Sequence, residues 1–101
     1  FPYRKENGVK NQGIDIILKK DKEILFIQCR DLNIKSNDKT DSKEIQYTRM
    51  NVRDYMERNK VFSMYKWKIL YVTPDNTLDI SAEHKLNEYN EEIEHRVIKV
   101  G

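Results

Sequence analysis

The chain has 101 residues, and its 19 basic and 17 acidic residues leave a formal net charge of only +2. A chain of this length fits one domain with a modest core, and the near balance of charge means that any basic surface for nucleic acid has to be local. No apolar run approaches the ~20 residues that span a bilayer, and no signal peptide begins the chain, so we expect no membrane partner.

The cysteine content and the first residue bear on where the chain comes from. The lone cysteine, Cys29, excludes an internal disulfide and is typical of a reducing, cytoplasmic compartment. Because the chain begins with Phe1 rather than methionine, we expect residues 1–101 to form a single domain of a longer protein that has further domains.

The first third of the chain favours strands. Residues 2–5 suit a short edge strand. Residues 14–20 and 23–30 are rich in isoleucine, leucine and phenylalanine, which is typical of strands. Residues 21–22 are the expected hairpin turn, and the polar residues 31–40 follow as a loop.

A long helix is expected next, from the cap Asp41 to about Asn59. Glu44 stands three residues after Asp41, which is the spacing of a capping box. One apolar stripe recurs at helical spacing, and its members are Ile45, Thr48, Val52, Tyr55 and Met56.

The remaining residues predict a strand, a short helix and a strand. Residues 67–73 are apolar and precede Pro74. Asp79 or Ser81 caps the helix, and residues 96–100 form the last strand. Strand–helix–strand alternation implies parallel neighbours. We therefore predict an α/β domain of order β-β-β-α-β-α-β, with a mixed sheet flanked by helices.

Three polar side chains interrupt the apolar hairpin near one end. With a two-residue turn, Lys20 faces Glu23. Each residue before Lys20 then faces the residue that is equally far after Glu23. Asp15 then faces Gln28, and Arg30 follows on the same face because side chains alternate. Both faces of the hairpin are otherwise apolar, which predicts a central sheet covered by helices on both sides.

A carboxylate buried in such a sheet requires compensation, because an unpaired one costs several kcal/mol. A divalent cation is one candidate, since Mg²⁺ prefers hard oxygen ligands. Asp15 offers a carboxylate, Gln28 an amide oxygen and Cys29 its backbone carbonyl. Arg30 is then placed to contact a phosphate.

An ion pair is the alternative compensation. Asp15 and Arg30 would pair diagonally with Gln28 hydrogen-bonded between them, and no metal would be needed. The thiol of Cys29 alternates onto the apolar face, so we expect it to lie in the core rather than to act as a nucleophile.

The residues of the hairpin resemble a known family. The run QGIDII at residues 12–17, followed one strand later by IQCR at residues 27–30, resembles the Mrr-type branch of the PD-(D/E)xK restriction-endonuclease-like superfamily. That branch reads GxD on one strand and QxK on the next. The likeness extends over most of the chain, because a capped helix, an apolar strand, a short helix and a last strand follow in the family's order.

The resemblance implies a restriction-endonuclease-like core and an endonuclease that hydrolyses DNA with Mg²⁺ or Mn²⁺. By likeness, Asp15 takes the place of the metal-binding aspartate, Gln28 that of the second ligand and Arg30 that of the lysine. A catalytically inactive domain of the same fold, serving as a nucleic-acid-binding or assembly module, is the alternative.

The chain departs from the family pattern in two places. Arg30 replaces the lysine, and because a guanidinium does not give up its proton, cleavage is expected to be weakened unless Lys35 or Lys43 substitutes. The first helix of the family, which carries a glutamate, is missing, and Glu6 is its nearest stand-in. A sheet face without that helix favours cover by another molecule, so a homodimer is a reasonable expectation.

Basic residues on the long helix are further candidates for contact with DNA. Arg49, Arg53 and Arg58 could form a rim for phosphates. Acidic residues are interspersed with them, and an ordinary solvated helix face is the alternative.

Overall fold

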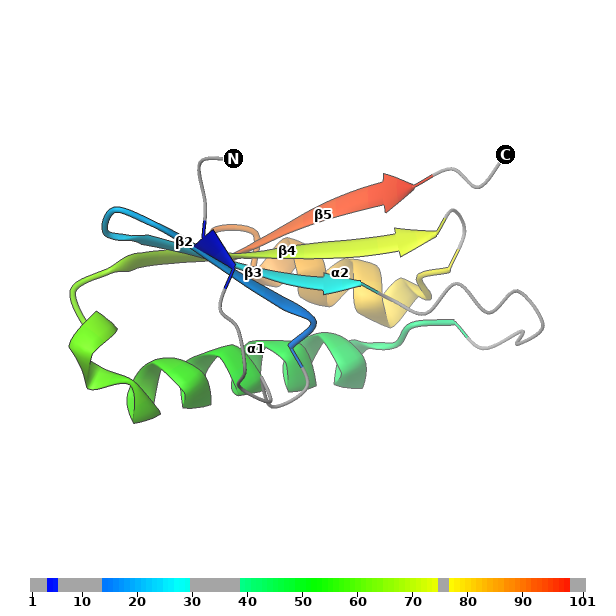
Figure 1. Cartoon of the computed structure of the whole chain (residues 1–101). Helices are drawn as coiled ribbons and strands as arrows, with labels where there is room; N and C mark the ends of the chain where they lie inside the picture. Colours follow the sequence, from blue (N-terminus) through cyan, green and yellow to red (C-terminus); the bar gives the residue numbers. More distant parts are fainter. Residues whose placement is uncertain (1–3, 6–13, 30–38, 75–76, 99–101) are drawn as a thin grey trace.

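The computed structural model describes residues 4–5, 14–29, 39–74 and 77–98. The strands and helices follow the predicted order, with one short 3₁₀ helix added before the fourth strand (Figure 1). They are β1 (Arg4–Lys5), β2 (Ile16–Lys20), β3 (Glu23–Cys29), α1 (Ser42–Arg58), η1 (Lys60–Phe62), β4 (Lys66–Pro74), α2 (Ile80–Glu88) and β5 (Ile93–Ile98).

The five strands form one mixed sheet whose spatial order equals their order in the chain. β1, β2 and β3 pair antiparallel, and β3, β4 and β5 pair parallel. Lys20 pairs with Glu23 and Ile16 with Ile27, which confirms the predicted two-residue turn. Asp21 in this turn has a φ of 52°, a left-handed conformation that aspartate tolerates better than most residues. The predicted α/β class with a mixed sheet is therefore confirmed.

Both helices lie on the same side of the sheet and contact each other (Figure 1). The reason is topological. Right-handed crossovers connect parallel strands in almost all proteins, and here β3, β4 and β5 advance across the sheet in a single direction. Two successive crossovers of the same hand and direction place their helices on one face. The expectation that helices would cover both faces is therefore wrong for the described part of the chain.

The face opposite the helices is only partly covered. Leu18 and Val72 on this face are buried, but Leu25, Ile27 and Leu70 are only half-buried. No helix of the described residues packs there.

Cys29 stands on this incompletely covered face, and its residue is exposed rather than in the core. The prediction of a core thiol was wrong because it assumed cover on both sides of the sheet. Strand alternation placed the side chain on the correct face, but no described element buries that face.

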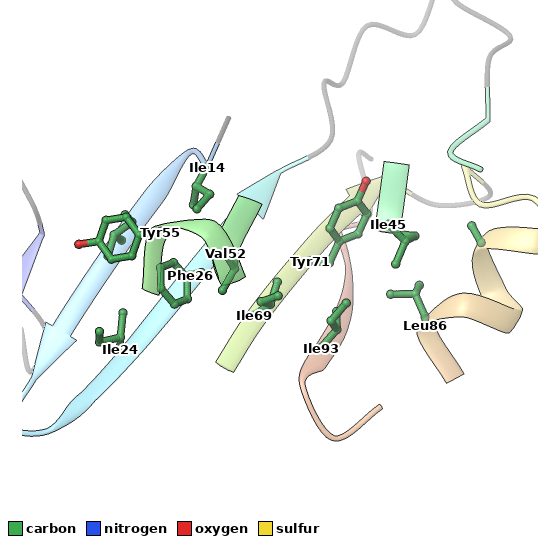
Figure 2. Packing of buried hydrophobic residues seen from close by; sticks show 12 residues of the cluster. Ile14, Ile24, Phe26, Ile45, Val52, Tyr55, Ile69, Tyr71, Leu86 and Ile93 are labelled. Carbon is green, nitrogen blue, oxygen red and sulfur yellow. The ribbon is translucent and has the colours of Figure 1, made fainter. Parts of the chain in front are cut away.

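The hydrophobic core fills the space between the sheet and the two helices. Phe26 at its centre is fully buried and makes edge-to-face contacts with Tyr55 of α1 and with Trp67 of β4, at ring-centroid distances of 5.4 and 6.3 Å. Figure 2 shows this packing extending through Ile69 to Ile93. Such aromatic pairs add to the stabilisation from apolar burial.

Both helix caps follow the predicted chemistry. Asp41 accepts a hydrogen bond from the backbone N–H of Glu44, and Asp79 accepts one from Ala82. The stripe of α1 is also confirmed, because Ile45, Thr48, Val52 and Tyr55 are all buried. Neither helix in the described ranges is long and apolar enough to cross a membrane.

The ends of four strands differ from the prediction, and β4 (Lys66–Pro74) is one residue longer at each end. β2 begins at Ile16 rather than Ile14, and β3 ends at Cys29 within the described residues. The last strand begins at Ile93, three residues before the predicted start, because Ile93 continues the ladder opposite Ile69 of β4. Residues 99–100 of the predicted strand lie outside the described residues.

Removal of the Phe26 ring provides a test of the core. We expect Phe26→Ala to lower the free energy of unfolding by about 3–5 kcal/mol, because the substitution leaves a cavity and removes two aromatic contacts. Urea denaturation followed by far-UV circular dichroism measures this loss. Val61→Ala is the matched control, since Val61 is 78% exposed and its truncation should change stability by less than about 0.5 kcal/mol.

Candidate functional site

Asp15 and Gln28 meet where the β2–β3 ladder ends. The backbone N–H of Asp15 donates to the side-chain oxygen Oε1 of Gln28 at 3.2 Å, and the backbone N–H of Cys29 donates to Oδ2 of Asp15 at 2.9 Å. The last paired residues of the ladder are Ile16 and Ile27. The two polar side chains thus accept hydrogen bonds from backbone groups just beyond the regular pairing. These bonds place Asp15 beside Gln28 and Cys29, but each joins a side chain to a backbone N–H. That the two side chains converge on one point therefore stays a prediction.

The burial of the two side chains differs from what the sequence suggested. Asp15 is exposed and Gln28 is half-buried. An exposed carboxylate that accepts a backbone hydrogen bond carries little desolvation cost. The argument that a buried charge at Asp15 requires a compensating cation therefore fails, because the end of β2 is open to solvent.

The donor atoms at this position nevertheless suit a hard cation. A carboxylate has about four lone-pair sites and an amide oxygen two, so one hydrogen bond to each leaves capacity for a metal ligand. Mg²⁺ usually takes one or two protein oxygens and keeps several waters, and an exposed position admits those waters. The residues present therefore fit the metal in type. Among the described residues, however, no group of three or more histidine, cysteine or acidic side chains is arranged to hold an ion.

The other residues predicted for the site are not brought together by the described structure. Arg30, Glu6 and Lys35 lie outside the described residues. Lys43 lies in the first turn of α1 with an exposed side chain. The roles of the phosphate-binding arginine, the upstream glutamate and a substitute lysine therefore stay predictions, as does that of the Cys29 carbonyl.

The pKa of the Cys29 thiol is affected by the nearby carboxylate of Asp15. Partial burial raises the pKa of the Cys29 thiol above its usual value, and the negative charge of Asp15 raises that pKa further. Both causes disfavour the thiolate. Cys29 is exposed, and a smaller fraction of it is therefore thiolate at neutral pH than of an ordinary cysteine.

The arginines of α1 are partly occupied by acidic neighbours. Arg49 binds Glu92 through Nε and Nη2, both at 3.0 Å, and its guanidinium stacks over the ring of Tyr89 at 4.4 Å. Arg58 forms an ion pair with Asp54 at 3.3 Å. These contacts tie α1 to the turn before β5 and favour a structural role for Arg49 over a phosphate rim.

An open surface groove of about 470 Å³ lies along the same part of α1. Its lining residues are Gln46, Arg49, Met50, Arg53, Asp54, Glu57 and Tyr89. Acidic and basic groups alternate around this groove, so its charge does not select an anionic ligand.

A polar pair that the sequence did not reveal, with Thr73 buried and His95 half-buried, lies on the helix-covered face. Thr73 of β4 is 1% exposed, and its hydroxyl Oγ1 lies 2.7 Å from Nε2 of His95 on β5. Partial burial lowers the pKa of His95, and the nearby carboxylate of Glu83 opposes this shift. The predicted last strand began at residue 96 and did not include His95. A strand predicted from Ile93 onward would have placed His95 on the helix-covered face, because strand side chains alternate.

Comparison of the chain with family models, with curated proteins and with solved structures finds no match.

Alkylation of the single thiol tests the closeness of Asp15 and Cys29. We expect Asp15→Asn to shift the pH profile of iodoacetamide labelling to lower pH and to speed labelling at neutral pH, because one of the two causes that raise the thiol pKa is removed. The second-order rate measured across a pH series gives the shift. Asp21→Asn changes an exposed carboxylate in the hairpin turn and should leave the profile unchanged. Equal profiles for all three proteins would contradict the geometry at the end of β2.

The histidine pair predicts a pH dependence of stability. The pKa of His95 is lowered in the folded protein, so the unfolded chain binds a proton more readily than the folded chain does. The free energy of unfolding should therefore fall as the pH drops below the usual histidine pKa of about 6.5. Urea titrations across this range should show a smaller fall in His95→Gln. His84→Gln, at an exposed position on α2, should retain the fall.

Proposed function

We propose that this chain is a Mg²⁺-dependent DNA phosphodiesterase domain of restriction-endonuclease-like type. The observation that supports the proposal is the nearness of Asp15 to Gln28 at the end of a hairpin, where the N–H of Asp15 donates to Oε1 of Gln28 and the exposed carboxylate of Asp15 accepts from the N–H of Cys29. These are the residue types, in the positions, that the resemblance to the Mrr-type branch requires. Asp15 is exposed and Gln28 is half-buried, so the Asp15 carboxylate is accessible to solvent.

The chain's own residues have separate roles in this proposal. Asp15 and Gln28 provide oxygen ligands, and the backbone N–H of Cys29 fixes the orientation of the Asp15 carboxylate through Oδ2. Arg30 binds a phosphate oxygen and neutralises negative charge that develops in the reaction, but it takes no proton. A bound Mg²⁺ would supply an acidified water and a charge that screens the phosphate.

A second candidate is a domain that keeps the fold as a nucleic-acid-binding or assembly module and has no hydrolase activity. The hydrogen bonds at the end of β2 favour it. Both acceptor oxygens already receive a backbone N–H, and the exposed Asp15 needs no cation for its stability. In this case Asp15 and Gln28 close the open end of the ladder, and their role is structural.

Metal binding by Asp15 distinguishes the two candidates. We expect titration calorimetry with Mg²⁺ or Mn²⁺ to give a binding heat in the parent protein, and that heat should be lost in Asp15→Asn because one oxygen ligand becomes a poorer donor. Asp21→Asn is the matched control, since it removes an equal charge at the opposite end of the hairpin. Cleavage of supercoiled plasmid in the same buffers should follow the binding heat. Plasmid binding without heat or nicking would support the second candidate.

Replacement of the arginine adds an independent readout. Arg30→Lys restores the residue type of the family and is expected to raise the nicking rate, because a lysine ammonium is able to exchange its proton. Lys35 and Lys43 are unchanged in this variant. If the parent protein binds metal but Arg30→Lys does not raise the nicking rate, the proposed assignment of Arg30 is contradicted.

A further inference from the structure

β5 forms an open edge of the sheet. It pairs only with β4, and no strand of the described residues pairs with its other side (Figure 1). Its sequence, IEHRVI, contains no proline or glycine. Two of its apolar residues, Val97 and Ile98, are 49% and 48% exposed. A strand edge of this kind has unpaired backbone groups that can pair with another chain.

The backbone groups that face outward can be assigned from the pairing with β4. The carbonyl of Glu92 accepts from the N–H of Ile69, and backbone groups of alternate residues point to opposite sides of a strand. Glu94 and Arg96 therefore direct their backbone groups to β4, whereas His95 and Val97 direct theirs to the open edge. The N–H of Ile93 is already used by the carbonyl of Tyr89, which leaves only the Ile93 carbonyl on that side.

The charges of β5 complement themselves when two copies run antiparallel. With His95 opposite His95 of the second copy, Glu94 of each chain lies opposite Arg96 of the other. That pair falls in a non-hydrogen-bonded position, where Cα atoms are only about 4.5 Å apart and side chains contact readily. Ile93 then faces Val97 of the second copy, so exposed apolar surface is covered as well.

Other alignments of two copies are disfavoured. A slip in one direction places Arg96 opposite Arg96, and a slip in the other places Glu94 opposite Glu94. In a parallel alignment the outward backbone groups of the two strands place odd-numbered residues opposite even-numbered ones, so Glu94 cannot lie directly opposite Arg96. Like charges directly opposite each other destabilise a strand pair. The charge pattern thus selects one register out of those that the outward backbone groups allow.

We propose that β5 pairs antiparallel with β5 of a second copy of this chain, in the register that centres on His95, to form a continuous sheet. Four backbone hydrogen bonds join the strands. His95 exchanges two with its counterpart, and the N–H of each Val97 donates to the Ile93 carbonyl of the other copy. The arrangement is self-complementary, as a twofold interface must be. The proposal does not depend on the cleavage proposal.

Mixing of charge variants tests the register. Glu94→Arg alone and Arg96→Glu alone each set two like-charged pairs across the interface, so each should weaken self-association by about tenfold or more. An equimolar mixture restores both opposite-charge pairs and should form a heterodimer with affinity near that of the parent. Sedimentation equilibrium of the parent, of each variant and of the mixture measures these constants. Loss of the exposed Glu94–Arg96 and Glu94–Lys68 pairs within one chain costs little stability, and circular dichroism checks the fold.

A backbone variant tests the hydrogen bonds. Val97→Pro removes an N–H that points to the open edge and not to β4, so the monomer should stay folded while self-association falls at least as much as in the charge variants. The proposal is overturned if the parent remains monomeric up to its solubility limit. A dimer that survives Val97→Pro, or variants that fail to associate preferentially with each other, would also overturn it, because the interface would then lie elsewhere, as on the sheet face opposite the helices.

Discussion

α1 and α2 both pack against a single face of the sheet and bury its apolar side chains there. Phe26, at the centre of that interface, contacts aromatic rings from α1 and from β4. Because every helix of the described residues is on this side, the opposite face lacks helical cover. The open features of the molecule therefore follow from the direction of its two crossover connections.

The same constraint determines the character of the candidate site. In a sheet covered on both faces, the carboxylate of Asp15 would be a buried charge whose presence alone indicated a cation. Here it is exposed and accepts a hydrogen bond from the backbone of Cys29. The site has oxygen atoms that suit a metal, but the exposed carboxylate does not need a metal for its stability. A measurement of metal binding, rather than of protein stability, therefore distinguishes a nuclease from an inactive domain.

Much of the fold and part of the site followed from local patterns. The turn at Asp21 set the register of the hairpin, and register is sensitive to a single residue because strand side chains alternate. The nearness of Asp15 to Gln28 could therefore be predicted. Their exposure could not, because it depends on which elements pack beside them. The start of β5 was placed too late for a similar reason, since Ile93 is in the strand through its pairing with β4 rather than through its own sequence pattern.

The order of the elements, the caps at Asp41 and Asp79, and the register of the first hairpin could be predicted from the amino-acid sequence, because each depends on residues close together in the chain. The covered face of the sheet, the contact between Thr73 and His95, and the edge position of β5 among the described strands became apparent only in the folded arrangement. These properties depend on the relative direction of strands that are far apart in the sequence, and a local pattern of side chains carries no information about that direction.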